Sequence, residues 1–226
     1  LVLISMFTGC SPKMLYPRLD WIIPWYVDDY ITLDHNQTFE FSSRLSTQLA
    51  WHCRTQLTQY ADFLRIIQRD IGIGDQPLTI ERLKFYSDQL ARYWGELIQR
   101  IGPDIIDILA SASDKQIAEL FENLEKKNRE LEKRIIEQPP AKIIQDRQYR
   151  MQKRLRYWFS DLTDSQKKAV KEWSKGLQPI GADWIAHRRK TQDLARRLLE
   201  DRKTSVDIEA EFLELLTNNK KLRSIT

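Results

Sequence analysis

Hydrophobic residues recur along most of the chain at steps of three and four, the spacing that places them on one face of an α-helix. Runs of this kind predict helices over about 19–31, 35–71, 80–101, 114–138 and 142–160. Two or three further helices are expected within 164–217, and the alternating pattern typical of strands is missing from the sequence. The pattern therefore predicts an all-α protein, a multi-helix bundle of long antiparallel helices and helical hairpins with no sheet.

The predicted helices differ in how their apolar residues are distributed. Residues 19–31 are apolar nearly all round, which predicts that this segment is buried. The helix over 35–71 has one apolar face, and Cys53 on it is expected to be a small buried side chain. The apolar face of 80–101 consists of Leu83, Tyr86, Leu90, Tyr93, Trp94 and Leu97. Gly102-Pro103 after it predicts a break and then a short helical piece.

The helix over 114–138 has the narrowest apolar face. Its residues follow one another at steps of four and three, and one of them is polar: Ile117, Phe121, Leu124, Asn128, Leu131 and Ile135. A seam of this kind suits a helical hairpin, and we expect Asn128 to fix its register.

A short motif precedes four of the expected helices. A capping residue is followed three positions later by Gln or Arg, in the pairs Asp34–Gln37, Thr79–Arg82, Ser113–Gln116 and Thr163–Gln166. The three pairs that end in Gln match the capping box, in which the cap side chain accepts from a backbone N–H and the Gln side chain accepts from the cap N–H. Helix starts are therefore predicted at these four places.

Composition supports helices and excludes several protein classes. The chain has 226 residues, of which 42% are hydrophobic and 30% charged, so it is too apolar for an intrinsically disordered protein. Only 7 Gly and 8 Pro are present, few for a fold rich in turns. No apolar run reaches the roughly 20 residues that span a bilayer. Cys10 and Cys53 are the only cysteines, which excludes a disulfide framework and a zinc site with several thiolates.

The first ten residues are interpreted as the end of a secretory signal. An apolar run, Leu1 to Phe7, leads into Thr8-Gly9-Cys10. A buried N-terminal segment, or a disulfide between Cys10 and Cys53, is the other interpretation.

The Thr-Gly-Cys segment resembles the lipobox of bacterial lipoproteins. The resemblance implies cleavage before Cys10, acyl chains on that residue and, through Ser11, delivery to the periplasmic face of the outer membrane of a Gram-negative bacterium. The expected organisation is a signal-peptide remnant over 1–9, a lipid-anchored tether over 10–18, a single helical domain over 19–217 and a frayed tail over 218–226.

Two further resemblances concern the helical part. The segments LDWIIPWYVDDYITLDHNQ and WHCRTQLTQYADFL resemble an uncharacterised family of all-helical Gram-negative lipoproteins, which implies an envelope location and no known activity. Leu162 to Gln166 resembles the Leu-Thr-x-x-Gln signature of periplasmic proteins of the Spy and CpxP type. That resemblance implies a chaperone or an envelope-stress factor.

Charge divides the expected helical domain into an acidic half, 19–120, and a basic half, 121–217. The first 120 residues carry 11 Lys and Arg against 15 Asp and Glu, whereas the remainder carries 25 against 17. Basic residues that form a candidate anionic-ligand face are Arg147, Arg150, Lys153, Arg154, Arg156, Arg188, Arg189 and Lys190. Anionic lipid headgroups are the expected partners and nucleic acid is not, since a periplasmic protein meets little of it. A solvated helical surface is the other interpretation.

Asp28, Asp29, His52 and Arg54 form a candidate polar cluster. Carboxylates near a histidine can bind a metal or share a proton, which would suit a hydrolase. Adjacent residues on a helix point about 100° apart, however, so Asp28 and Asp29 do not readily serve one site. In the other interpretation one Asp pairs with Arg44 or Arg54, and His52 hydrogen-bonds within the core.

We therefore expect a non-catalytic, lipid-anchored protein that binds envelope proteins or lipids, with membrane lipid as a partner through Cys10. No catalytic residue, metal or cofactor is assigned. The Spy and CpxP type of activity and the hydrolase stay as alternatives, and the sequence does not indicate an oligomeric state.

Overall fold

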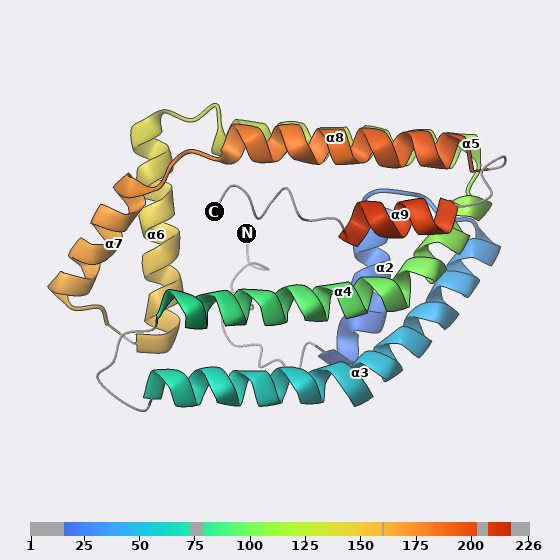
Figure 1. Cartoon of the computed structure of the whole chain (residues 1–226). Helices are drawn as coiled ribbons and strands as arrows, with labels where there is room; N and C mark the ends of the chain where they lie inside the picture. Colours follow the sequence, from blue (N-terminus) through green and yellow to red (C-terminus); the bar gives the residue numbers. More distant parts are fainter. Residues whose placement is uncertain (1–15, 73–78, 160, 203–207, 218–226) are drawn as a thin grey trace. The chain divides into compact units, whose positions relative to one another are not determined.

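The computed structural model describes residues 16–72, 79–159, 161–202 and 208–217 (Figure 1). The expected leader, the lipid attachment at Cys10 and the C-terminal tail lie outside the described residues. All regular elements in the described ranges are helices, which confirms the all-α prediction. They are η2 (Tyr16–Arg18), α2 (Leu19–Asp28), α3 (His35–Gly72), α4 (Ile80–Ser111), α5 (Asp114–Ile135), α6 (Pro140–Phe159), α7 (Asp164–Gly176), α8 (Gly181–Glu200) and α9 (Ile208–Thr217). None of these described helices is long and apolar enough to cross a membrane.

The chain divides into two compact units. Unit 1 consists of the residues up to Phe121 and those from Leu194 onward, and unit 2 is Glu122–Asp193. Unit 1 holds η2, α2, α3, α4, α9, the start of α5 and the end of α8. Unit 2 holds the rest of α5 and α8 together with α6 and α7. The expected single domain over 19–217, with its acidic and basic halves, stays a prediction.

The four predicted helix starts are confirmed. Thr79 Oγ1 accepts from the backbone N–H of Arg82 at 3.2 Å. The three pairs that end in Gln all form complete capping boxes, with both hydrogen bonds between 2.8 and 3.3 Å. Each box satisfies two backbone donors at a helix start, and a capping side chain of this kind is worth about 1 kcal/mol.

Two of these boxes in unit 1 are bonded to each other. Gln116 Nε2 donates to Gln37 Oε1 at 2.6 Å and to the Thr32 carbonyl at 2.8 Å. Gln37 is 6% exposed, and its amide also donates to the carbonyl of Ser111 at 3.3 Å. Glu119 accepts from the Thr32 hydroxyl at 2.6 Å. The first turns of α3 and α5 are therefore held together by side chains that also cap them.

An aromatic cluster joins α3 to α4, which run side by side in opposite directions (Figure 1). Phe63 of α3 contacts Tyr86 and Tyr93 of α4 edge-on, with ring centroids 5.9 and 5.8 Å apart. The Tyr86 hydroxyl donates to Asp70 at 2.7 Å, so burial of this ring leaves its polar group satisfied. The predicted apolar face of α4 is wrong in part, because Leu83, Leu90 and Trp94 are 51%, 59% and 47% exposed. Only the tyrosines of that face reach the cluster.

The predicted break at Gly102-Pro103 is wrong, because α4 continues through it to Ser111. Proline removes one backbone donor and costs a helix roughly 3 kcal/mol. Beyond it, Ile106 and Ile108 are 4% and 9% exposed, and each buried isoleucine contributes about 1.5–3 kcal/mol. Gly102 lies directly against the Leu213 side chain of α9, which would have to move if Gly102 carried a Cβ. The packing of α4 and α9 thus stabilises the continuous helix by more than Pro103 destabilises it.

Two predictions of burial are also wrong. The segment 19–31 forms a helix only as far as Asp28, and no residue of α2 is buried; Trp21 and Trp25 are 66% and 61% exposed. On α3, Cys53 is exposed. Gln56, at 3% exposure, occupies the inner face instead and donates to Glu96 at 3.3 Å. Because Gln56 is polar, it was not among the apolar residues from which the buried face of this helix was predicted.

In unit 2, α5 and α8 meet along a seam that has Asn128 at its centre. Asn128 is 0% exposed, accepts from Arg188 Nε at 2.7 Å and donates to Gln192 at 2.6 Å. Arg189 forms ion pairs with Glu125 at 3.0 Å and with Glu132 at 2.7 Å. The predicted seam with one polar residue is therefore present. Its partner is α8 rather than the next helix in the chain, so the prediction that the seam belongs to a helical hairpin is wrong.

Candidate functional site

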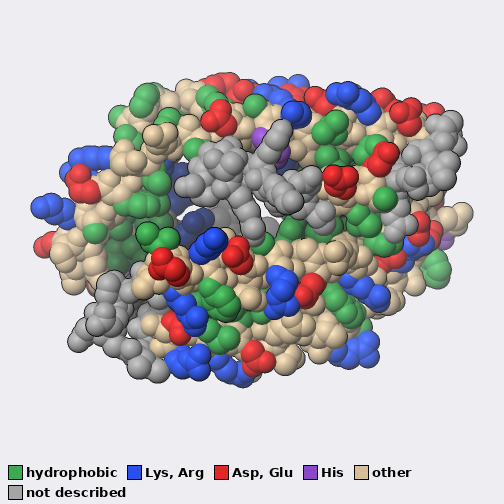
Figure 2. Space-filling view, in the orientation of Figure 1, with side chains coloured by type: hydrophobic (Ala, Val, Ile, Leu, Met, Phe, Trp, Pro, Cys, Tyr) green, Lys and Arg blue, Asp and Glu red, His purple; other side chains and the backbone are tan. Residues whose placement is uncertain are grey.

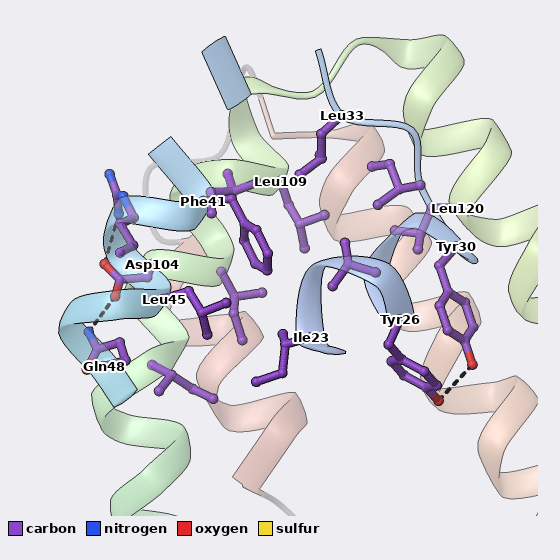
Figure 3. A pocket seen from close by; sticks show the side chains of 16 residues that line it. Ile23, Tyr26, Tyr30, Leu33, Phe41, Leu45, Gln48, Asp104, Leu109 and Leu120 are labelled. Carbon is purple, nitrogen blue, oxygen red and sulfur yellow. Dashed lines mark hydrogen bonds and ion pairs between the residues drawn. The ribbon is translucent and has the colours of Figure 1, made fainter. Parts of the chain in front are cut away.

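A cavity with almost wholly apolar walls lies in unit 1 (Figure 3). It has a volume of about 420 Å³, within the range of small-ligand sites. Four helices and the turn after α2 line it, through Ile23, Tyr26, Val27, Tyr30, Ile31, Leu33, Phe41, Arg44, Leu45, Gln48, Ile101, Asp104, Ile105, Ile108, Leu109 and Leu120.

Local sequence explains why these side chains converge. On α3 the lining positions 41, 45 and 48 are separated by four and three residues, and on α4 the positions 101, 105 and 108 repeat that spacing. The positions 23, 27 and 30 do the same along α2 and the turn after it. Such residues share one face of a helix. The cavity thus lies where the apolar faces of three consecutive elements meet.

Polar groups of the lining lie at its edge and bond to one another. Asp104 of α4 accepts from Arg44 Nη1 at 2.9 Å and from the Gln48 amide (Figure 3). Arg44 also pairs with Asp107 at 2.7 Å and with Glu40 at 2.5 Å. These hydrogen bonds to Asp107 and Glu40 raise the pKa of Arg44, so the guanidinium is charged at any physiological pH. Arg100 Nε donates to Gln48 at 3.1 Å on the same side, so two cations face three carboxylates and this edge has a net negative charge.

A second polar pair borders the cavity on the side of α2. The hydroxyls of Tyr26 and Tyr30 lie 3.0 Å apart, and their rings are 5.3 Å apart (Figure 3). Tyr26 is 56% exposed. Apolar walls with a few polar groups at the edge are typical of sites that bind an apolar ligand with a small polar end.

The members of the predicted polar cluster have different surroundings. His52 Nδ1 lies 3.1 Å from the Tyr16 hydroxyl, which also donates to the Leu49 carbonyl at 2.9 Å. Arg54 donates to the Ala50 carbonyl of its own helix at 3.2 Å. Asp28 and Asp29 are exposed at the end of α2. Within the described residues no three His, Cys, Asp or Glu side chains come together so as to hold a metal ion. The cluster as a catalytic site stays a prediction.

His52 makes unit 1 sensitive to acid. Burial lowers the pKa of His52 below its usual 6.5, so the unfolded chain takes up a proton at a higher pH than the folded protein. Stability should therefore be complete above pH 6.5 and fall as the pH drops below it. We expect the unfolding free energy, measured in urea at pH 7.5 and 5, to fall less in His52→Gln than in the unchanged protein.

The matched control for His52 is His35, which is exposed at the start of α3. His35→Gln should keep the full loss of stability between the two pH values. Equal losses in both variants would show that His52 does not cause the acid sensitivity.

The predicted anionic-ligand face is distributed over α6 and α8. Arg188 and Arg189 are bonded into the seam around Asn128. Lys153, Arg154, Arg156 and Lys190 are exposed, whereas Arg147 and Arg150 border a smaller cavity in unit 2. On the side of the molecule shown in Figure 2, Lys and Arg alternate with Asp and Glu rather than forming one basic area. Binding of an anion by the whole face stays a prediction.

Sequence reasoning missed the apolar cavity. Ile23, Leu45 and Ile105 each appear as ordinary core positions, because nothing in a single helix indicates that the space between three helices is left open. The one signal available was Arg44, placed among apolar residues at a helical spacing from Phe41 and Gln48. A charged residue so placed requires partners, and the structure supplies them from Asp104 and Asp107.

Over the part of the chain that the structure describes, fold and site define the class of all-helical proteins with an apolar cavity of ligand size. The chain belongs to the family of unknown function DUF6279, which matches residues 29–225. No curated protein and no solved structure matches the chain.

Proposed function

We propose that this chain is a non-catalytic, lipid-anchored protein at the periplasmic face of the outer membrane, and that its unit 1 cavity binds the aliphatic chain of a lipid. The observation that carries the proposal is the cavity itself. Its walls are almost wholly apolar, and its polar side chains are bonded to one another at the edge. A bound aliphatic chain would bury apolar surface without separating any of these pairs.

The charges at the edge of the cavity determine which charge the polar end of a ligand can carry. Arg44 is matched there by Glu40, Asp104 and Asp107, so carboxylates outnumber cations. A free carboxylate on the ligand would be repelled, whereas a neutral or cationic end would be accepted. The favoured ligand is thus a neutral or amine-bearing amphiphile with one aliphatic chain in the cavity.

The position of α2 in the sequence supports a cavity close to the membrane that is expected at Cys10. Eight residues separate Cys10 from Leu19, and a chain of that length spans roughly 30 Å at most. The exposed Trp21 and Trp25 are residue types that favour the membrane–water interface, while Ile23 and Val27 of the same helix line the cavity. One helix therefore offers interfacial aromatics on its outer side and part of the ligand site on its inner side.

The test of the cavity uses two adjacent positions on α3. Leu45→Trp fills the cavity, whereas Ser46→Trp adds the same ring at an exposed position outside the lining. With pyrene-labelled probes of one chain length ending in an amine, an alcohol or a carboxylate, we expect affinity in that order for the unchanged protein. Leu45→Trp should weaken binding of the alcohol probe at least about tenfold, and Ser46→Trp less than about twofold.

Leu45→Ala provides a second variant in case the tryptophan disturbs folding. It enlarges the cavity and should keep binding, with the helical circular-dichroism signal as a check on the fold. Equal binding of the alcohol probe by Leu45→Trp and Ser46→Trp would exclude the cavity as the binding site.

The anchor is tested separately through Cys10. In the membrane fraction of the native host, the intact mass of the mature chain should exceed that of the polypeptide beginning at Cys10 by the mass of its acyl groups. Cys10→Ala should abolish this excess and release the protein from the membrane. The same mass in both forms would remove the lipid anchor while leaving the cavity measurement untouched.

A further inference from the structure

A second cavity, in unit 2, has a different chemistry from the first. It has a volume of about 270 Å³ and lies between the end of α5, α6 and the start of α8. Its lining is Arg134, Ile135, Ile143, Asp146, Arg147, Arg150, Pro179, Ile180, Gly181 and Trp184. Three guanidinium groups therefore border one small space in which apolar side chains form the remaining walls.

Arg147 is held in place by the last turn of α7 and the residue that follows this helix. Its Nη1 donates to the carbonyl of Ser174 at 2.9 Å and to that of Leu177 at 3.1 Å. Ser174 is 0% exposed, so this attachment point is fixed by packing. Both hydrogens of Nη1 are used, while Nε and Nη2 of the guanidinium form no hydrogen bond with the described residues and can bind a ligand. A cation fixed in this way loses little freedom when it binds an anion.

Arg134 and Arg150 add two unmatched charges. Both are exposed, and neither forms an ion pair within the described part of the chain. The single carboxylate of the lining, Asp146, pairs with Lys142 at 2.9 Å. After that pairing, three positive charges on the lining have no negative partner.

The remaining walls can accept an apolar group. Ile143, Ile180 and the Trp184 ring line the cavity beside the arginines. Gly181, the first residue of the 20-residue helix α8, also borders it, so the positive end of that helix dipole adds to the charge of the arginines. Two N–H groups of one guanidinium can donate to two oxygens of the same phosphate. Phosphate is therefore a better match for these arginines than a halide ion.

We infer that the unit 2 cavity binds a phosphate group attached to an apolar or aromatic moiety, with Arg134, Arg147 and Arg150 contacting the phosphate and Trp184 the apolar part. The inference concerns a different unit and a different ligand from the proposed function and does not depend on it. Such a phosphate can belong to a free phosphomonoester or to a lipid headgroup.

Calorimetry with phenyl phosphate on the full chain tests the site. Arg150→Gln should weaken binding about tenfold, the loss of a charge-assisted contact, and Arg134→Gln should do the same. The matched control is Lys133→Gln, next to Arg134 near the end of α5, exposed and outside the lining, with a loss below about twofold. Inorganic phosphate should bind more weakly than phenyl phosphate, because it makes no contact with Trp184.

The source of the phosphate is distinguished with phosphatidylcholine vesicles that contain phosphatidic acid. Binding to these vesicles that Arg150→Gln weakens and Lys133→Gln does not would identify a lipid headgroup. The same pattern with phenyl phosphate alone would identify a free phosphomonoester. Equal losses in both variants, or no binding of either probe at millimolar concentration, would overturn the inference. Leu45→Trp should leave phenyl phosphate binding unchanged.

Discussion

Replacement of Arg202 by methionine should lower the free energy of unfolding by about 3 kcal/mol. The Arg202 side chain is 2% exposed, and it donates to the carbonyls of Leu199 at 2.6 Å and of Ala112 at 2.8 Å. Methionine fills much of the same volume but leaves both carbonyls without a donor. Leu199 and Ala112 are 1% and 4% exposed, so water cannot readily replace the lost bonds.

The ion pair of Arg202 with Asp114 contributes much less than the carbonyl bonds. Asp114 is 78% exposed, so its side of the ion pair lies in water, where such pairs contribute little. Asp114→Asn should therefore cost below about 1 kcal/mol. Urea unfolding followed by circular dichroism measures both variants. A larger loss for Asp114→Asn than for Arg202→Met would show that the ion pair, rather than the carbonyl contacts, stabilises this part of unit 1.

Asn128→Ala should cost about 3 kcal/mol and loosen the contact between α5 and α8. The substitution leaves a cavity at a fully buried position and removes the acceptor of Arg188 and the donor to Gln192. Glu125 also loses a hydrogen bond of 3.0 Å from the Asn128 amide. Since that bond and the Arg189 ion pair lower the pKa of Glu125, its pKa should rise toward the usual 4.5.

Lys126→Ala is the control for Asn128. Lys126 is exposed on the same helix, so its loss should change the unfolding free energy by less than about 0.5 kcal/mol. Urea unfolding and the titration of Glu125 by NMR measure the two effects of Asn128→Ala independently. Equal stability in the Asn128 and Lys126 variants would mean that the polar seam contributes nothing beyond ordinary helix contacts.

Helix positions and helix starts followed from the sequence because they depend on local chemistry. Thr163 and Gln166 form their box with each other, and nothing elsewhere in the chain is required. Asn128 was recognisable as a seam residue because it interrupts a regular apolar repeat on its own helix. Its partner Arg188 was instead assigned to an exposed basic face, because pairing across two helices leaves no mark in the sequence.

The errors arose where tertiary packing decides. Pro103 is a helix breaker by its own chemistry, yet contacts of Gly102 and the isoleucines after it keep α4 continuous. Tryptophan is a residue type that is expected in a core, but Trp21 and Trp25 are exposed because only one side of α2 lines the cavity. The cavities themselves depend on the space between helices, which a periodic pattern within each helix does not describe.

The bonded capping boxes of Gln37 and Gln116 have a consequence for how the chain acquires its structure. The two glutamines are 79 residues apart in sequence, so the start of α3 lacks its final partner until the ribosome has delivered the start of α5. A nascent chain that ends before Gln116 would carry a long α3 that has its local Asp34–Gln37 cap but lacks the bond from that cap to α5. The first turns of α3 and α5 are thus joined in a single step, which comes late in the synthesis of the chain.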